Sequence, residues 1–137
     1  MYIVGNKVYI IKVRERNMAS VLIVDDAAFM RMSIRRMLEA NGHTMAGEAG
    51  SGVEAVQRYL SVKPDVVLLD ITMPEMNGVE ALKRIKVLDP NAKVIICTAI
   101  GQQAMLAEAV ENGASDFIVK PFEVDRLLAA IDKVMNK

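Results

Sequence analysis

Short apolar runs alternate with amphipathic stretches from Met18 to the end of the chain. The apolar runs contain almost no polar residues, which is typical of strands covered by helices on both faces. The stretches between them are about one helix long, and their apolar residues recur at helical spacing. This alternation predicts repeated βα units and a parallel sheet. The predicted strands are Ser20–Val24, Met45–Ala49, Val66–Leu69, Lys93–Cys97 and Asp116–Val119.

Turn-forming residues separate the five predicted helices from the strands. The first helix carries apolar residues on one face, from Ala27 to Leu38, and ends at Asn41-Gly42. The other four are Gly52–Leu60, Gly78–Leu88, Gln102–Asn112 and Phe122–Met135. Five strands and five helices predict an α/β (βα)5 domain, and right-handed crossovers would place helices on both faces of its doubly wound sheet.

Residues 1–17 do not continue this repeat, so we divide the chain into 1–17 and a domain at 18–137. Gly5-Asn6 lies between two runs rich in β-branched residues, which predicts a β-hairpin. An isolated hairpin is marginally stable in water. The alternative is a non-native start, because Met18-Ala19-Ser20 resembles a natural beginning of the domain.

The balance of charges and the composition argue against several classes of function. The 137 residues contain 17 basic and 17 acidic side chains, so they do not favour nucleic acid or a membrane surface. We find neither a membrane-spanning run nor a secretory signal. The single cysteine, Cys97, cannot form an internal disulfide, which favours the cytoplasm. We expect Cys97 to be buried and inert, and His43 to be solvated in a loop.

Polar residues follow the predicted strands where each strand ends: Asp25, Asp26, Asp70, Thr98 and Lys120. The carboxyl ends of parallel strands share one edge, and ligands bind where the strand order reverses. The alternation of strands and helices does not fix the strand order, but in one common order of such sheets, 2-1-3-4-5, that point lies between the first and third strands. Asp70 would therefore face Asp25 and Asp26 across the crevice.

Three neighbouring carboxylates need a counter-charge to remain ionised together. Aspartates without histidine or cysteine suit Mg²⁺, with Mn²⁺ as the alternative, and argue against zinc. A metal with Lys120 can stabilise a transferring phosphoryl group, Thr98 supplies a hydroxyl, and aspartate is a known nucleophile for this chemistry. Each residue alone has a simpler interpretation: Asp26 could cap the next helix, and Lys120 could be a solvated surface lysine.

The chain resembles the receiver domains of response regulators over residues 19–136. The resemblance rests on four motifs, 21–26 (VLIVDD), 64–78 (PDVVLLDITMPEMNG), 97–99 (CTA) and 113–122 (GASDFIVKPF). It implies the flavodoxin-like order 2-1-3-4-5, for which a chemotaxis receiver is a standard example.

The resemblance also implies residue roles. Asp70 would accept a phosphoryl group from a histidine kinase or a small donor. Mg²⁺ would be held by Asp25, Asp26, Asp70 and the backbone carbonyl of Thr72. Thr98 and Lys120 would bind phosphoryl oxygens, the Lys120–Pro121 peptide would be cis, and Phe117 would be the switching aromatic. Many relatives carry tyrosine at the Phe117 position, so a switch through a phenol hydrogen bond is excluded here.

Within the family, residues 26–31 (DAAFMR) and 99–105 (AIGQQAM) resemble chemotaxis regulators of the CheY type. Such a regulator would act as a monomer and would catalyse only its own phosphorylation and dephosphorylation. Its partners would be a histidine kinase, a motor switch protein or an archaeal motor adaptor, and a possible phosphatase. Phosphorylation would draw Thr98 toward Asp70 and move Phe117, which would change affinity at the surface of the fourth helix, fifth strand and fifth helix.

Three other functions fit parts of the pattern. A phosphorelay intermediate would have the same site and a different docking surface. An aspartyl-phosphate hydrolase of the haloacid dehalogenase type carries Asp-x-Asp on its first strand, whereas this chain has Asp25-Asp26 there. A flavin-binding flavodoxin would need a phosphate-cradling loop after the first strand, and the sequence does not contain one.

Overall fold

The computed structural model describes residues 2–9, 18–73 and 75–136. Met1, residues 10–17, Pro74 and Lys137 lie outside the described residues, so part of the predicted N-terminal extension and one residue of the 64–78 motif are not placed. The main domain contains β3 (Ser20–Val24), α1 (Ala28–Glu39), β4 (Thr44–Ala49), α2 (Gly52–Val62), β5 (Val66–Asp70), α3 (Gly78–Leu88), β6 (Val94–Thr98), α4 (Gln103–Glu111), β7 (Asp116–Val119) and α5 (Val124–Met135). These bounds differ from the sequence predictions by at most two residues at each end.

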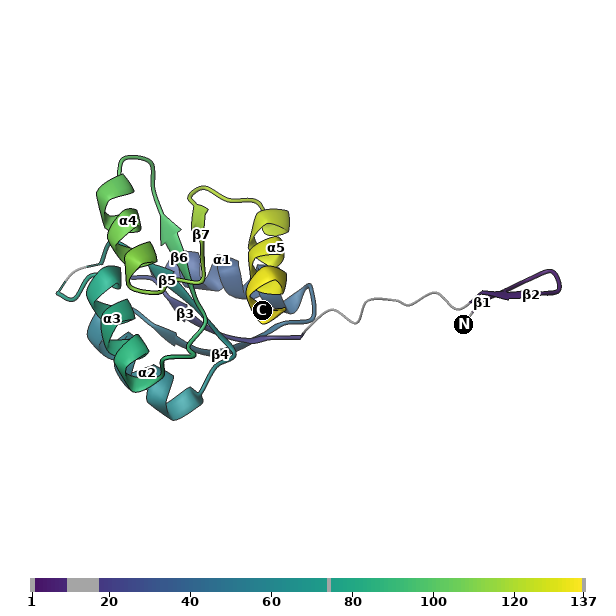
Figure 1. Ribbon diagram of the computed structural model, residues 1–137, viewed down its shortest axis with the longest axis horizontal. Helices are drawn as coiled ribbons and strands as arrows, with labels where there is room; N and C mark the ends of the chain where they lie inside the picture. The colour runs from purple at the N-terminus through teal and green to yellow at the C-terminus, as the bar shows by residue number, and fades with distance from the viewer. Residues whose placement is uncertain (1, 10–17, 74, 137) are drawn as a thin grey trace.

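The five strands of this domain form one parallel sheet in the order β4-β3-β5-β6-β7. In chain order this is 2-1-3-4-5, so the predicted flavodoxin-like doubly wound fold is confirmed (Figure 1). The strand order reverses between β3 and β5, which lie side by side with Leu22 opposite Val67. This reversal creates the switch point at which the carboxyl ends of the two strands diverge.

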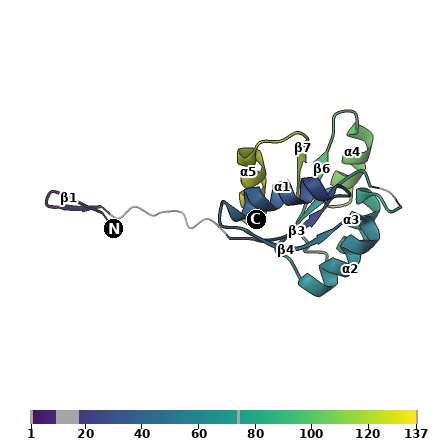
Figure 2. The ribbon, with the colours of Figure 1, turned by 180° about the vertical axis from the view of Figure 1, so that it is seen from behind.

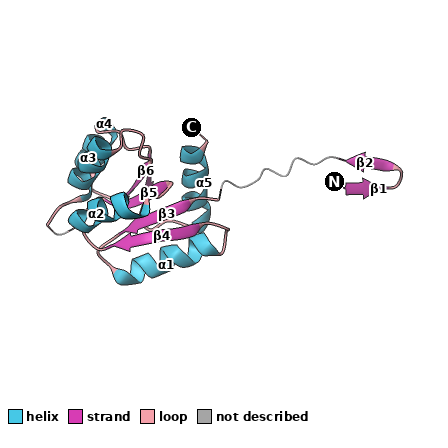
Figure 3. Cartoon of the chain, turned by 90° about the horizontal axis from the view of Figure 1, so that it is seen from below, coloured by secondary structure: helices cyan, strands magenta, loops and turns pink. Residues whose placement is uncertain are grey.

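Alternate residues of the inner strands build two hydrophobic cores. Leu22, Leu69 and Ile96 face α2, α3 and α4, whereas Ile23 and Leu68 face α1 and α5. Figure 2 shows α1 running in front of the sheet, and Figure 3 shows α1 and α2 on opposite sides of β3 and β4. Burial of each such side chain contributes roughly 1.5–3 kcal/mol, so the inner strands form a firm support for the loops at their ends.

The expectation that every strand is covered on both faces is correct for the inner strands and wrong for the two edge strands. All five residues of β5 and of β6 are buried. In β4 only Ala49 is buried, and in β7 only Ile118. Each edge strand has a neighbour on one side only, so its backbone and several side chains reach solvent.

The expectation that His43 is solvated is wrong. The side chain is 3% exposed, and its Nδ1 accepts a hydrogen bond from the backbone N–H of Ala19 at 3.0 Å. Because Ala19 precedes β3 and His43 precedes β4, this bond joins the beginnings of two adjacent parallel strands. A buried backbone N–H needs an acceptor, and the imidazole supplies it.

The first described segment is an antiparallel hairpin of β1 (Tyr2–Val4) and β2 (Lys7–Tyr9), and within the described part of the chain these strands pair only with each other. Gly5 in its turn has a φ of +63°, in the region that glycine adopts without strain. Within the described part of the chain, none of the helices is both long and apolar enough to span a bilayer.

Candidate functional site

The polar residues predicted at the strand ends all lie at the carboxyl edge of the parallel sheet. Asp25 and Asp26 follow β3, and Lys120 follows β7. Asp70 and Thr98 are the last residues of β5 and β6. Because these strands are adjacent and parallel, one edge of the sheet receives residues that are up to 95 positions apart in sequence.

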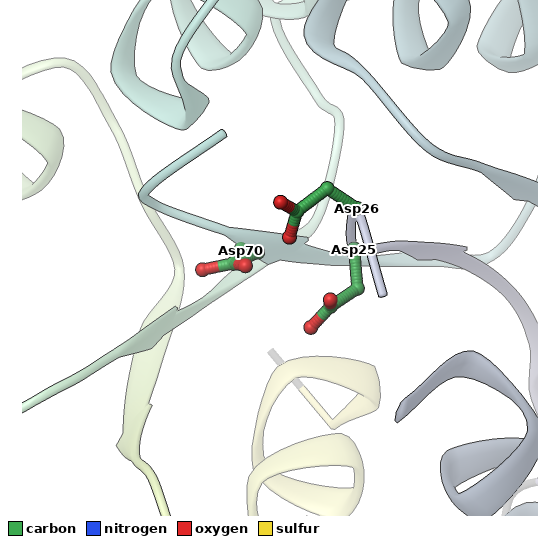
Figure 4. Close-up of side chains that lie close together, drawn as sticks. All are labelled: Asp25, Asp26 and Asp70. Carbon is green, nitrogen blue, oxygen red and sulfur yellow. The ribbon is translucent and has the colours of Figure 1, made fainter. Parts of the chain in front are cut away.

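The three aspartates converge at the switch point, as Figure 4 shows. One carboxylate oxygen from each lies within 4.8 Å of the others. Asp25 and Asp70 are buried, with 3% and 8% of their surface exposed, whereas Asp26 is exposed. The cluster is therefore closed on the protein side and open to solvent at Asp26.

Lys120 reaches into this cluster from the end of β7. Its Nζ lies 2.7 Å from Asp25 Oδ2 and 3.3 Å from Asp70 Oδ2. The sequence allowed Lys120 to be a solvated surface lysine, but its side chain is only 22% exposed and is ion-paired to both carboxylates. The peptide bond between Lys120 and Pro121 is cis.

Burial raises the pKa of the Asp70 carboxyl above its ordinary value. The charge of Lys120 and the Thr72 N–H, which donates to Asp70 Oδ1 at 3.2 Å, offset part of this rise, and the charge of Asp25 adds to it. Burial alone would lower the pKa of Lys120, but its hydrogen bond to Asp25 and the charges of both carboxylates raise it. The lysine is therefore charged at neutral pH and stabilises the carboxylates beside it.

The cluster has the donor set that a hard divalent cation prefers. Three carboxylates and one ammonium leave an excess of two negative charges (3 − 1 = 2) at the switch point. All three ligand residues offer oxygen, and the described residues place no histidine or cysteine among them. Oxygen ligands with an open, solvated side suit Mg²⁺, which keeps several of its waters. The residues present thus fit the ion.

Gly78 fixes the position of the Asp70 backbone from the far side of the β5–α3 loop. An ideal Cβ at Gly78 would lie 2.3 Å from the Asp70 carbonyl oxygen and 2.7 Å from Ile71 Cα. The helix begins here because Asn77 caps it, with its Oδ1 accepting from the Glu80 N–H at 3.0 Å. Only a residue without a side chain allows α3 to start this close to β5.

Thr98 ends β6, the strand next to β5, whereas Phe117 lies one strand further out, in β7. Thr98 is buried, and among the described residues no hydrogen bond joins its hydroxyl to Asp70. Phe117 lies in β7 opposite Ile96 and is 37% exposed, and its carbonyl accepts a hydrogen bond from Arg126 at 2.6 Å. A groove of about 160 Å³ lies between the end of β6 and Val119, lined also by Ile100 and Leu106.

The alternative interpretation of Asp26 as a helix cap is wrong. The N-cap of α1 is Ala27, and no side chain caps it. Asp25 instead accepts the Ala27 N–H at its Oδ1, at 2.9 Å. Arg31, which the sequence did not single out, donates to the Asp25 carbonyl at 2.6 Å and lies 3.4 Å from Glu48. These contacts orient Asp25 and leave the Asp26 carboxylate facing the cluster.

Sequence reasoning also missed Gln102. Its side-chain oxygen accepts from the Thr98 hydroxyl at 3.2 Å and from the Ala99 N–H at 2.8 Å, and its Nε2 donates to the Thr72 hydroxyl. The available signal was its position four residues after Thr98, just before α4. That spacing alone does not indicate a contact with a loop 30 residues earlier.

Comparison with known proteins agrees with this geometry. A model of the response regulator receiver domain matches residues 21–132. The chain is 58% identical to the chemotaxis protein CheY of Thermotoga maritima, over 83% of this chain and 95% of that protein. It is 38% identical to the sporulation initiation phosphotransferase F of Bacillus subtilis, over 84% of this chain and 92% of that protein.

Among solved structures, the fold resembles CheY of Borrelia burgdorferi in its complex with CheX, BeF₃ and Mg²⁺. The TM-score is 0.81 at 36% sequence identity, and the match covers 86% of this chain and 90% of that one. The family match spans most of the chain, and the sheet order and the acidic cluster are those that the receiver motifs imply. The chain therefore belongs to the response regulator receiver family and, within it, is a chemotaxis receiver of the CheY type.

Proposed function

We propose that this receiver accepts a phosphoryl group on Asp70 from a histidine kinase and thereby changes its affinity for a chemotaxis partner. The observation that carries the proposal is the position of Asp70. Its carboxylate lies at the switch point, beside two further aspartates and 3.3 Å from the Lys120 ammonium. A carboxylate in such surroundings can act as the nucleophile of a covalent phosphoryl transfer.

Asp25, Asp26, Asp70 and the Thr72 carbonyl are the groups that would hold Mg²⁺. The ion, when bound, supplies positive charge that offsets the carboxylates and the phosphoryl oxygens. The side chains of Asp70 and Lys120 carry out the rest of the transfer. One Asp70 oxygen attacks phosphorus, the bond from phosphorus to the donor atom breaks, and the leaving group departs with its electron pair. Lys120 stabilises the negative charge on the phosphoryl oxygens during this transfer.

The switch follows from the new group on Asp70. A phosphoryl group adds charge and three strong acceptor oxygens next to Lys120 and near Thr98. We propose that Thr98 then donates to one of these oxygens, that the loop after β6 moves with it, and that Phe117 changes its exposure on β7. A shift from 1:99 to 99:1 between two states requires a differential interaction of about 5.5 kcal/mol.

The partner would be a motor switch protein or an archaeal motor adaptor that docks on the surface of α4, β7 and α5. A phosphatase is a second class of partner that we propose. The Borrelia relative was solved in a complex with another protein, CheX, so a receiver of this fold forms complexes of this kind. A phosphorelay role remains a second candidate, since the chain is 38% identical to a sporulation phosphotransferase. In that role Asp70 would pass its phosphoryl group to a histidine instead of signalling by docking.

Titration with Mg²⁺ and beryllofluoride tests the proposal. The chain contains no tryptophan, so amide resonances are a better probe than intrinsic fluorescence. We expect the amides of Thr98, Ala99 and Phe117 to shift in the wild type and to remain unchanged in Asp70→Asn. A full response in Asp70→Asn would contradict the assignment of Asp70. Transfer of the phosphoryl group from Asp70 to a histidine phosphotransferase, faster than its hydrolysis, would favour the phosphorelay role.

A further inference from the structure

We propose that Gln102 is a positioning residue that holds the Thr98 hydroxyl in the unphosphorylated domain and must release it for the switch. The inference rests on the proposed function, since it assigns the group that opposes the movement of Thr98. Gln102 lies just before α4 and is not a member of the carboxylate cluster.

The Gln102 amide bridges the two loops that flank Asp70. Its Oε1 accepts from the Thr98 hydroxyl at 3.2 Å and from the Ala99 N–H at 2.8 Å. Its Nε2 donates to the Thr72 hydroxyl in the loop after β5. One amide group thus joins the end of β6 to the loop whose N–H donates to Asp70.

The hydrogen bond from Thr98 to Gln102 competes with the hydrogen bond that the switch requires. A threonine hydroxyl has a single proton to donate. In the unphosphorylated domain the nearer of its two acceptors is Gln102 Oε1, at 3.2 Å, and the other is the Ala99 carbonyl, at 3.4 Å. Among the described residues, no hydrogen bond joins the Thr98 hydroxyl to Asp70. To donate to an oxygen on Asp70, Thr98 must first give up Gln102. A net hydrogen bond of ordinary strength changes an equilibrium roughly threefold to tenfold, which is the bias we assign to this contact.

The neighbouring glutamine provides a matched control. Gln103 is the first residue of α4 and lines the same groove as Gln102. Among the described residues, the side-chain hydrogen bonds that this pair of glutamines makes to Thr72, Thr98 and Ala99 all belong to Gln102. Replacing either glutamine by alanine removes the same atoms at nearly the same place. Only Gln102→Ala removes the nearer acceptor of the Thr98 hydroxyl, whereas the Ala99 carbonyl remains in both variants.

The experiment measures apparent affinity for beryllofluoride at fixed Mg²⁺ in the full chain, using the Phe117 amide as the probe. We expect Gln102→Ala to bind roughly threefold to tenfold more tightly than the wild type, because the nearer competing acceptor of the Thr98 hydroxyl is gone. Gln103→Ala should match the wild type. In the Thr98→Val background, where no hydroxyl remains to be held, Gln102→Ala should give no gain. If Gln102→Ala does not fold, Gln102→Met repeats the test with a side chain of similar length.

A second readout needs neither metal nor beryllofluoride. The Ala99 amide loses its hydrogen bond to Gln102 Oε1 in Gln102→Ala, so its resonance should move in the free protein and stay in place in Gln103→Ala. Equal affinities in the two alanine variants would overturn the inference, and so would a gain that persists in the Thr98→Val background. If the wild-type protein shows no response to beryllofluoride, the proposed function itself is contradicted. Failure of the Gln102 inference and failure of the proposed function are therefore distinguishable.

Discussion

Lys120 is hydrogen-bonded to Asp25, with Nζ 2.7 Å from Asp25 Oδ2, and lies 3.3 Å from Asp70. The ammonium lies closer to Asp25, a proposed metal ligand, than to Asp70, the proposed phosphoacceptor. The ammonium therefore supplies part of the positive charge that Mg²⁺ would bring to the cluster. Metal and lysine should consequently substitute for one another in stabilising the fold.

Replacing Lys120 with methionine tests this substitution. The Lys120→Met variant leaves three neighbouring carboxylates without their ammonium, and we expect it to lose about 2 kcal/mol of unfolding free energy in EDTA. Saturating Mg²⁺ should restore most of the loss. Urea unfolding with and without Mg²⁺ measures both effects. Lys133→Met is the control, because Lys133 is 59% exposed and lies 3.8 Å from Asp116. An equal loss in both variants would contradict the coupling.

The Gly78→Ala variant tests the support of Asp70. The added Cβ would overlap the Asp70 carbonyl, so β5 or α3 must shift, and we expect a loss of about 3 kcal/mol. Phosphorylation should fall as well, since the carboxylate moves with its backbone. Gly50→Ala is the matched control: its nearest neighbour would be Arg31 Nη1, at an ordinary 3.5 Å. Thermal unfolding and acetyl phosphate labelling check both outcomes, and normal labelling of folded Gly78→Ala would contradict this role.

The contact between Tyr59 and Asp89 predicts a dependence of stability on pH. Tyr59 donates to Asp89 Oδ2 at 2.7 Å, and this bond, with the Asn91 N–H, lowers the pKa of Asp89. Because the pKa of Asp89 is lower in the folded state than in the unfolded state, the ionised carboxylate stabilises the fold at pH values above its unfolded-state pKa, near 4. This stabilisation is lost as the pH falls through the folded-state pKa of Asp89.

Tyr59→Phe should therefore be less stable than the wild type at pH 7, and the difference should shrink as pH falls below about 4. Unfolding midpoints of both proteins across this pH range measure the effect. Tyr59 is itself buried, and phenylalanine retains its packing, so the hydroxyl is the only group removed. A difference that stays constant down to the acid limit would show that the Asp89 hydrogen bond is not its source.

Removal of residues 1–17 tests the proposed division of the chain. Among the described residues, β1 and β2 pair only with each other, and both hydrophobic cores are built from residues after Met18. We expect the 18–137 protein to keep the unfolding midpoint and the beryllofluoride affinity of the full chain. Calorimetry and the amide titration measure both quantities. A clear fall in either would mean that the hairpin region supports the domain.

The fold was accessible from sequence because its signals are local. Apolar runs such as Val66–Leu69 and the glycines and prolines between elements mark the βα units, and the inner strands are buried as their composition predicts. The exposure of β4 was missed, although β4 contains Thr44, Gly47 and Glu48 and is less apolar than the inner strands. His43 was missed because its partner, the Ala19 N–H, is brought near only by the pairing of β3 with β4.

The arrangement of the site shows the same limit. The positions of Asp25, Asp70 and Lys120 at one edge follow from strand ends in a parallel sheet. The preference of Lys120 for Asp25 and the bridge made by Gln102 depend on side-chain rotamers and loop paths. Contacts of that kind join residues 30 to 95 positions apart and leave no pattern in the sequence.

The most direct test of the account is to locate the phosphoryl group itself. The full chain is incubated with acetyl phosphate and Mg²⁺, and its mass and peptides are analysed before the acyl phosphate hydrolyses. We predict the addition of one phosphoryl group, on the peptide that contains Asp70, and no addition in Asp70→Asn or when EDTA replaces Mg²⁺. Equal labelling of Asp70→Asn, or a label that maps to Asp25 or Asp26 in the wild type, would contradict the account.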